Sequence, residues 1–412
     1  MIIVKGRINL ISKVNRGKIM SRWTRTILHF DLDAFFCSVE SLLNPGLEGK
    51  AFVVGGSAEG RGVVASASYA AREFGIRSAM PTAQAMRKNP ALIVISSQHA
   101  LYSKHSQEIM SFLRDSTPVV EQLSIDEAFL DASDDPRNGP EVARFLQREI
   151  LERFKLPTSW GVASNKLVAK IATEVGKPRG LIVVPPGQEA AFLAPLPVRM
   201  LWGVGPKTEE RLAERGVHTI GDMASMSAHA LIGTLGDLGL ELASRARGED
   251  ARPVIEGRDP KSMSAERTFS ADMSDWPMLR TVLLRLSETV GRRLRKAALA
   301  GHTIRIKVRW PDFTTKTRQV RLEQPTDRER IIFDESCKLF QGLWKKGQAV
   351  RLLGVGVSDL HEPIHQLDMF DRKWDRNEGL QQAIDSIRER YGPDSLRRAG
   401  GLRKQAPSER DM

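Results

Sequence analysis

Ser124-Ile125-Asp126-Glu127-Ala128 is the most informative stretch of the chain, because it places two adjacent carboxylates between apolar residues. Neighbouring residues in an extended chain point to opposite sides. Only one of the two acids can therefore share a face with a third carboxylate, unless the backbone bends. Two adjacent acids repel each other, and their burial requires a compensating cation. The stretch predicts either a site for a divalent metal ion or a solvated turn.

Apolar segments flank this acidic pair and place it near the tip of a hairpin. Residues 119–123 predict the strand that leads to it, and residues 128–131 predict the returning strand. A further buried strand over residues 26–31 ends in Asp31, and Asp33 follows. Asp31 is thus the candidate for the third acid. Oxygen ligands of this kind select hard cations.

The composition limits the class of protein. A chain of 412 residues with 41% hydrophobic residues is expected to form several packed domains. The net charge of +12 indicates a polyanionic partner, either nucleic acid or an anionic membrane surface. No apolar run approaches membrane-spanning length. The two cysteines, Cys37 and Cys337, form no paired motif, which fits a reducing cytosol and predicts neither a disulfide nor a zinc site.

Residues 1–25 form a basic N-terminal extension with seven Lys or Arg residues and no acid. They lack the uninterrupted apolar segment and the small-residue cleavage site of a signal peptide. We interpret them as a disordered leader, with Met20 as an alternative start to Met1.

Two aromatic residues, Phe35 and Phe36, come directly after the acidic end of the first strand. One ring is expected to pack in the core, whereas the other could form the wall of a pocket. Residues 38–40 are expected to open the helix that follows.

Two basic segments suit the binding of phosphate. Residues 69–77 predict a helix on which Tyr69 and Arg72 share one face near the start. The glycine-flanked loop 176–180 presents Lys177 as a contact for a triphosphate. The alternatives are a plain surface contact for the first segment and a solvated lysine for the second.

The ordered set of motifs resembles the Y-family DNA polymerases and is closest to the DNA polymerase IV (DinB-type) branch. The resemblance covers roughly residues 26–361, and its motifs occur in the order of the family. They are residues 30–36, 69–72, 75–81, 124–128, 161–166 and 176–178.

The resemblance implies a catalytic centre of three acids, Asp31, Asp126 and Glu127. In the family these positions hold two Mg²⁺ ions, and the carbonyl oxygen of Leu32 is implied as a further ligand. Mn²⁺ accepts the same oxygen ligands and remains an alternative. Asp33 is interpreted as structural support.

The same resemblance assigns residues to the incoming deoxynucleotide. Phe36 matches the steric gate, a ring that excludes the 2′-hydroxyl of a ribonucleotide, and Phe35 belongs to the same pocket. Tyr69, Arg72 and Lys177 match the residues that hold the triphosphate.

Residues 201–208 resemble a helix-hairpin-helix, with a helix over 207–215. Gly203 and Gly205 would expose backbone N–H groups to a DNA phosphate, and Lys207 would add a cation. A simple turn between two helices is the alternative.

The region after residue 262 changes in pattern. Residues 277–299 predict an amphipathic helix, and residues 303–310 predict a strand with strict alternation. The polar face of that strand carries Arg305, Lys307 and Arg309 with no interleaved acid. This row favours a track for DNA phosphates over a merely solvated face.

Further elements complete a β-α-β-β-α-β order that resembles the little-finger domain of the family. They are strands over 265–271, 315–322 and 350–357 and a helix over about 327–344.

The segment after this domain resembles the peptide by which bacterial proteins bind the sliding clamp. Its residues are Gln366, Leu367, Met369 and Phe370, and a loop folded back on the domain is the alternative. One short, highly charged helix is expected beyond it, near residues 380–387.

The predicted fold class is α+β and multidomain: a right-hand polymerase with palm, fingers, a helix-hairpin-helix thumb and a little finger. The expected boundaries, after the extension 1–25, are the palm at 26–190 with fingers inserted at about 36–100, the thumb at 191–255, a linker at 256–262, the little finger at 263–361 and the tail at 362–412.

The predicted function is low-fidelity, template-directed translesion DNA synthesis without proofreading. The expected partners are primer–template DNA, deoxynucleotides and the sliding clamp. We expect a cytoplasmic monomer without membrane contact. The alternatives are a non-catalytic scaffold that binds DNA and the clamp, a metal-dependent nuclease, and a mutasome-type Y-family polymerase.

Overall fold

A computed structural model describes residues 23–257, 259–363, 372–392 and 395–396. The chain divides into two compact units. One contains most of the chain up to Gly257, and the other contains residues 258–412 with two short segments, 56–63 and 81–84. Among the described helices, none combines the length and the apolar composition needed to cross a bilayer.

A five-stranded sheet with the order β5-β6-β1-β7-β8 forms the centre of the first unit. The strands are β1 (Ile27–Leu32), β5 (Val119–Gln122), β6 (Glu127–Asp131), β7 (Thr158–Ala163) and β8 (Leu181–Val183). The central strand β1 pairs antiparallel with β6 and β7. The predicted strands and the hairpin that carries the acidic pair are confirmed.

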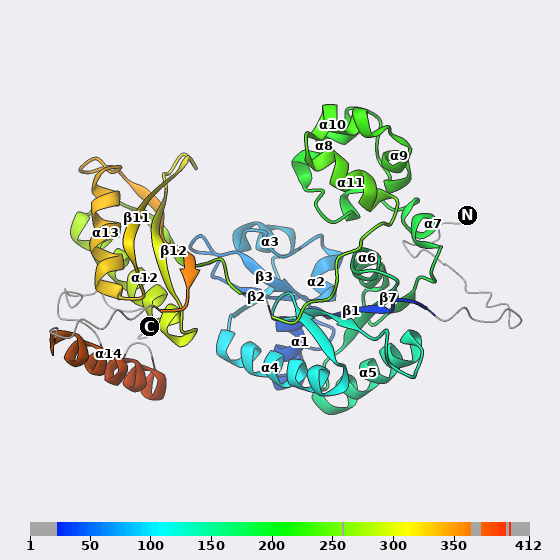
Figure 1. Cartoon of the computed structure of the whole chain (residues 1–412), viewed down its shortest axis with the longest axis horizontal. Helices are drawn as coiled ribbons and strands as arrows, with labels where there is room; N and C mark the ends of the chain where they lie inside the picture. The colour runs from blue at the N-terminus through cyan, green and yellow to red at the C-terminus, as the bar shows by residue number, and fades with distance from the viewer. Residues whose placement is uncertain (1–22, 258, 364–371, 393–394, 397–412) are drawn as a thin grey trace, which may run out of the picture. The chain divides into compact units, whose positions relative to one another are not determined.

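Helices cover both faces of this sheet (Figure 1). Helix α6 (Lys166–Gly176) packs on one face, and α4 (His99–Ser116) and α5 (Gly139–Phe154) lie on the other. Because side chains alternate along a strand, Leu28 and Phe30 face α4 and α5. The intervening residues of β1 therefore face α6.

A smaller sheet with the order β3-β2-β4 belongs to the same unit. Its elements and neighbours are α1 (Phe35–Leu43), β2 (Phe52–Gly55), β3 (Val64–Ala67), α2 (Tyr69–Glu73), α3 (Thr82–Lys88) and β4 (Ile93–Ser96). Two predicted boundaries were wrong. Helix α1 begins at Phe35 rather than at Ser38. Helix α2 ends four residues early, because Gly75 adopts a left-handed conformation with φ of 71°.

Five short helices follow along the chain, and the predicted hairpin lies between the first two. They are α7 (Glu189–Leu193), α8 (Pro206–Ala213), α9 (Ile220–Ser225), α10 (Ala228–Leu235) and α11 (Leu238–Ala246). Helix α8 begins one residue earlier than predicted, with Gly205 as N-cap and Pro206 at its first position, where proline loses no hydrogen bond.

A buried ion pair joins α6 to the edge strand β5. The side chains of Lys166 and Glu121 are 1% and 2% exposed. Lys166 also donates to the carbonyl of Pro253 at 3.2 Å, and the Ile255 N–H donates to Glu121 at 3.1 Å. The pair therefore fastens the segment that leaves α11 to the central sheet.

We expect Lys166→Ala to lower the free energy of unfolding by about 3 kcal/mol, since removing one partner leaves a buried carboxylate without its ammonium group. Urea unfolding would measure this loss. The exposed Lys104 provides the matched control, and Lys104→Ala should change the value by less than about 0.5 kcal/mol. Equal stability of the two variants would show that the pair contributes nothing.

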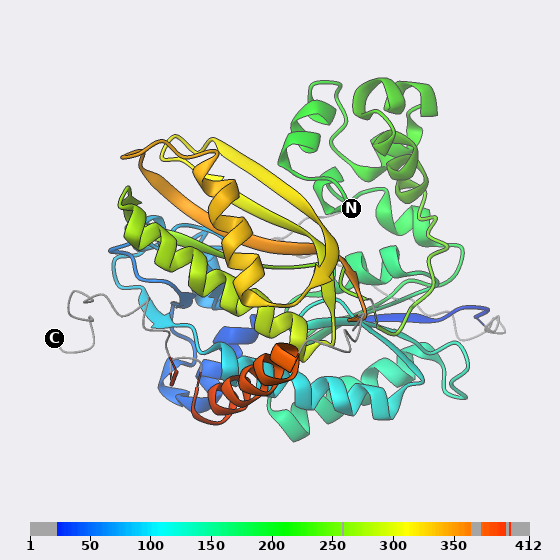
Figure 2. The ribbon, with the colours of Figure 1, turned by 60° about the vertical axis from the view of Figure 1, so that its left-hand side comes forward.

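The second unit contains a four-stranded sheet with the order β11-β10-β12-β9 and two helices over one face (Figure 2). Its elements are β9 (Ser262–Met273), α12 (Trp276–Lys296), β10 (Ala300–Arg309), β11 (Thr315–Thr326), α13 (Glu329–Gln341) and β12 (Val350–His361). The predicted β-α-β-β-α-β order is confirmed, and β9 begins at Ser262, inside the predicted linker.

The last helix, α14 (Arg372–Tyr391), is longer than the short helix predicted. It is joined to α12 by ion pairs, with Arg295 at 2.7 Å from Asp385 and Lys296 at 3.2 Å from Glu389. This helix is therefore part of the second unit.

Candidate active site

The register of the central sheet brings two of the predicted acids together. Asp31 lies directly opposite Glu127 in the β1–β6 ladder, so both side chains point toward α6. Asp126 precedes β6 in the turn, and its carbonyl accepts the Leu32 N–H at 2.9 Å. The backbone bend at this turn is what allows both adjacent acids to lie close to Asp31.

Helix α6 and the loop after it supply two cations to these acids. The Lys177 ammonium lies 2.9 Å from Asp31 and 2.8 Å from Glu174, and Lys170 donates to Glu127. Burial raises the pKa of Asp31 to about 7; Lys177 opposes this shift, and the neighbouring Asp126 and Glu127 add to it. Burial therefore favours the protonated form of Asp31 despite the adjacent Lys177.

The neighbours of Glu127 stabilise its charged form. Burial alone would raise its pKa, but hydrogen bonds from His29 and Lys170 lower it to about 2. His29 lies 3.3 Å from Glu127, and its other ring nitrogen lies 2.9 Å from the Thr173 hydroxyl. Burial lowers the pKa of His29 to about 4, so the ring is neutral at pH 7. His29 thus orients Glu127 without adding a charge.

Asp126 is held from within its own turn. Its N–H donates to the Ser124 hydroxyl at 3.2 Å, and that hydroxyl donates to the Asp126 carboxylate. This arrangement is a short Ser-x-Asp turn, in which the hydroxyl fixes both the backbone and the side chain. Ser124 therefore has a hydrogen-bonding role in this turn.

The donor set fits a hard cation in kind. Asp31, Asp126, Glu127 and the Leu32 carbonyl offer oxygen atoms only, as Mg²⁺ and Mn²⁺ prefer. In the described part of the chain, no three acidic, histidine or cysteine side chains converge on one point as ready-made ligands. Asp31 and Glu127 are instead paired with Lys177 and Lys170, and the Ser124 hydroxyl donates to Asp126.

Asp33 is fully engaged in structural hydrogen bonds. One carboxylate oxygen accepts from the Ser159 hydroxyl at 2.8 Å and from the Tyr69 hydroxyl at 3.0 Å, and the other accepts from the Arg179 N–H at 2.8 Å. Asp33 therefore ties α2 and the loop after α6 to the end of β1, which agrees with a supporting role.

The predicted phosphate-binding residues lie around this end of the sheet. The Arg72 guanidinium lies 4.6 Å from the centre of the Tyr69 ring and donates to the Ala67 carbonyl at 3.1 Å. Burial and the nearby Asp33 raise the pKa of Tyr69, so its phenol stays protonated. Through Asp33, Tyr69 is linked to the strand that carries Asp31.

The two phenylalanines at the start of α1 have different environments. Phe35 is 3% exposed and packs in the core, whereas the Phe36 ring is partly exposed. Phe36 stacks on Tyr102 with the ring centres 4.3 Å apart. Of the two rings, only that of Phe36 is exposed enough to contact a ligand.

The predicted DNA-binding residues lie at two places, one in each unit. Gly203 adopts φ of 107°, a conformation that favours glycine, and it precedes the Gly205 cap of α8; Lys207 is exposed. Arg305, Lys307 and Arg309 lie on the open face of β10.

The row on β10 contains no acid of its own, as the sequence shows, but an acid from another strand reaches it. Lys307 pairs with Glu266 of β9 at 2.9 Å, although β12 lies between the two strands. The intervening residue in register is Gly354, which has no side chain to block the contact. The predicted clamp-binding residues Gln366, Leu367, Met369 and Phe370 lie outside the described residues.

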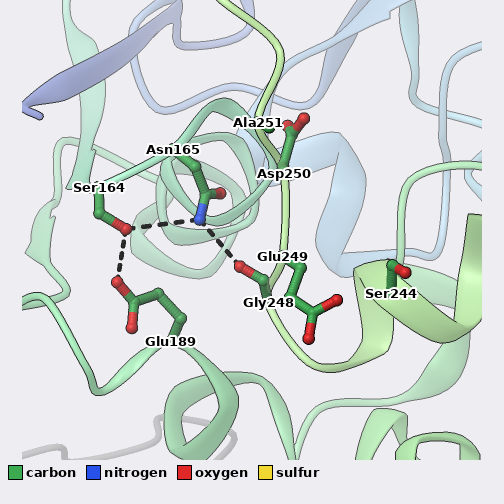
Figure 3. A pocket seen from close by; sticks show the side chains of 8 residues that line it. All are labelled: Ser164, Asn165, Glu189, Ser244, Gly248, Glu249, Asp250 and Ala251. Carbon is green, nitrogen blue, oxygen red and sulfur yellow. Dashed lines mark hydrogen bonds between the residues drawn. The ribbon is translucent and has the colours of Figure 1, made fainter.

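A separate pocket lies beside the N-terminus of α6 (Figure 3). Ser164 donates to Glu189 at 2.5 Å, and the Asn165 amide donates to the Gly248 carbonyl at 2.9 Å. Three of its lining residues are acidic, and the predicted catalytic acids are not among them. The pocket is unsuited to a triphosphate, because like charges would repel.

Sequence reasoning missed several residues that hold the site. They are His29, Glu40, Tyr102, Ser159, Lys170 and Thr173. The only available signal was helical spacing in α6, where Lys170 and Thr173 share a face. Nothing in the local sequence connects that face to β1.

The chain matches known proteins over most of its length. The profile of the impB/mucB/samB family matches residues 30–174, its C-terminal domain matches 260–369, and the IMS family HHH motif matches 186–217. A DNA polymerase IV of Dehalococcoides mccartyi is 42% identical over 90% of this chain and 96% of its own. The chain belongs to the Y family of DNA polymerases. A DNA polymerase IV of Streptomyces coelicolor is 43% identical, over 85% of this chain and 74% of its own.

Solved structures of Y-family polymerases share the fold. A Y-family DNA polymerase chimera superposes with a TM-score of 0.74 at 28% identity and covers 81% of this chain and 98% of its own. An insertion ternary complex of the Dbh DNA polymerase gives 0.61 at the same identity and coverages. The predicted fold class and the DNA polymerase IV branch are confirmed. These relatives are all polymerases and give no support to a scaffold.

The Y-family polymerase described here is therefore a DNA-directed DNA polymerase of the translesion type. Its partners are DNA and deoxynucleotides, and it shares the metal dependence of its family.

Proposed function

We propose that Asp31, Asp126 and Glu127, with the Leu32 carbonyl, hold two Mg²⁺ ions at the end of the central sheet. The observation that carries this proposal is the pairing of Asp31 with Glu127 on the face toward α6, beside the turn that holds Asp126. Mn²⁺ is a suitable substitute, because it accepts the same oxygen ligands. When bound, the ions activate the primer hydroxyl and neutralise the leaving pyrophosphate.

The chain's own residues position the nucleotide for in-line transfer. Lys177 lies between Asp31 and an exposed Glu174, where its ammonium can meet a phosphate oxygen. Tyr69 and Arg72 add a hydroxyl and a guanidinium, and Arg suits phosphate because its donors form a planar fork. The partly exposed Phe36 ring serves as the steric gate, and the buried Phe35 supports the pocket from the core.

Primer extension tests the metal assignment. Purified protein is given labelled primer–template and a single deoxynucleotide, and Mg²⁺ is withdrawn with a chelator. We expect incorporation to fall to background, because three acids without their ions repel the triphosphate. DNA binding, followed by fluorescence anisotropy, should persist without Mg²⁺. Incorporation that continues after chelation would contradict the assignment.

We propose two tracks for the DNA backbone. The N–H groups near Gly203 and Gly205, with Lys207, contact phosphates of the duplex, as helix N-termini do. Arg305, Lys307 and Arg309 contact phosphates from β10. Such contacts do not depend on the base sequence. The affinity for DNA should therefore fall with rising salt concentration by the same factor for every DNA sequence.

We propose the functional division palm 26–190 with fingers at about 36–100, thumb 191–255, linker 256–262 and little finger 263–361. The division of the chain near Gly257 agrees with a boundary in that linker. The polymerase acts as a cytoplasmic monomer. The free thiols Cys37 and Cys337 fit a reducing compartment, and the monomeric state rests on the resemblance.

Gln366, Leu367, Met369 and Phe370 bind the sliding clamp in this proposal. We expect Phe370→Ala to weaken binding to the clamp about tenfold or more, since a buried aromatic anchor dominates such small interfaces. Surface plasmon resonance on immobilised clamp would measure the loss. Clamp-free primer extension is the control and should not change. A parallel loss in both assays would mean that Phe370 supports the fold instead.

A further inference from the structure

The Phe36 ring rests on a second aromatic ring from a distant part of the chain. Tyr102 of α4 is fully buried, and its ring lies nearly parallel to that of Phe36, at 14° and 4.3 Å between centres. His99, one turn earlier on α4, meets the edge of Phe36 at 89° and 5.9 Å. Phe36 therefore has one face covered by Tyr102 and further ring contacts with His99 and Phe35, which leave it little freedom to tilt.

A buried carboxylate holds Tyr102 in turn. The Tyr102 hydroxyl donates to Glu40 at 2.5 Å, and the Gln98 amide donates to the same carboxylate at 3.1 Å. Glu40 is 5% exposed and lies four residues after Phe36, on the same face of α1. One helix thus carries both the ring and the acid that fixes its support.

A glutamate is an unexpected choice for this place. The other buried residues of α1 are Phe35, Cys37 and Val39, and burying an acid costs free energy unless donors satisfy it. Here the donors come from Tyr102 and Gln98, both at the start of α4. An apolar residue would fill the space without that cost. We therefore infer that the role of Glu40 is to accept the hydrogen bond from the Tyr102 hydroxyl and so fix the position of this ring.

We propose that Glu40 and Tyr102 are positioning residues that hold the Phe36 ring in its plane, and that sugar selectivity depends on them. The inference rests on the proposed role of Phe36 as steric gate. A gate excludes a 2′-hydroxyl only if its ring cannot retreat. Tyr102 lies directly behind Phe36 and cannot move without breaking its hydrogen bond to Glu40. Tyr102 and Glu40 therefore act as a stop, meaning that they prevent the Phe36 ring from moving away from the sugar.

The test compares ribonucleotide with deoxynucleotide incorporation opposite one template base, as a ratio of kcat/KM values. Tyr102→Leu should raise the ribonucleotide ratio roughly tenfold, because both the stacked ring and its hydroxyl are lost. Tyr102→Phe keeps the ring and should raise it roughly threefold. Glu40→Leu should match Tyr102→Phe, whereas Glu40→Gln keeps an acceptor and should restore most of the selectivity.

Two controls separate this inference from the gate itself. Tyr391→Phe removes the hydroxyl of an exposed tyrosine and should leave the ratio unchanged. Phe36→Ala should relax selectivity more than any variant behind it. If Phe36→Ala relaxes sugar selectivity and the Tyr102 and Glu40 variants do not, the proposed role of Tyr102 and Glu40 is overturned. The proposed role of Phe36 as steric gate is then retained. If Phe36→Ala leaves the ratio unchanged, the proposed steric-gate role of Phe36 is contradicted, and the proposed role of Tyr102 and Glu40 is contradicted with it.

A loss of fold would not imitate the expected result. The ratio is measured on active protein, so a partly unfolded variant lowers both incorporation rates together. Tyr102→Phe preserves the volume of the buried ring and remains informative if Tyr102→Leu does not fold. A fall in both rates with a constant ratio in Tyr102→Phe and Glu40→Leu would show a purely structural role and overturn the proposal.

Discussion

Asp126→Ala is expected to lower nucleotide incorporation at least about a thousandfold, because it removes a proposed metal ligand from the centre of charge neutralisation. The loss should appear in kcat, since the proposed triphosphate contacts of Tyr69, Arg72 and Lys177 remain. Single-turnover primer extension with one deoxynucleotide measures the effect.

The fold should tolerate this substitution. Asp126 lies in a turn, and its side chain contacts the Ser124 hydroxyl, which water can satisfy in its place. Primer–template affinity should therefore stay within about threefold of the wild type. Asp134→Ala, at an exposed position beyond β6, is the matched control and should retain full incorporation. Loss of DNA binding together with activity would assign Asp126 to folding rather than to catalysis.

Phe36→Ala is expected to raise the ribonucleotide-to-deoxynucleotide ratio about a hundredfold, because a cavity replaces the ring proposed to clash with a 2′-hydroxyl. Most of the change should come from faster ribonucleotide incorporation. Deoxynucleotide incorporation should fall by a smaller factor, since the ring also contributes to packing against Tyr102.

Competing ribonucleotide and deoxynucleotide substrates in one primer-extension reaction would measure the ratio directly. Phe74→Ala removes a half-exposed ring near the end of α2 and serves as the control for a lost phenylalanine. An unchanged ratio in Phe36→Ala would remove Phe36 from sugar selection, whatever its effect on the rate.

Local patterns predicted much of the fold. Strict alternation over residues 303–310 placed β10 correctly, because a strand with one buried face must repeat every two residues. Predicted helix ends were wrong where one residue with an unusual backbone conformation ends the helix, as the left-handed Gly75 does after α2. The length of α14 was underestimated, since its highly charged sequence has a weak apolar stripe and its ion pairs with α12 are tertiary.

The order of the acids and the β-α-β-β-α-β order could be read from the sequence, because each depends on residue type and short spacing. The roles of the candidate nucleotide residues came from the family resemblance. Only the tertiary structure shows which side chains contact these residues. Lys170 reaches Glu127, Tyr102 supports Phe36, and Glu266 reaches Lys307 across a glycine. Periodicity tells which face of an element a residue occupies. Only the packing of distant elements determines what lies against that face.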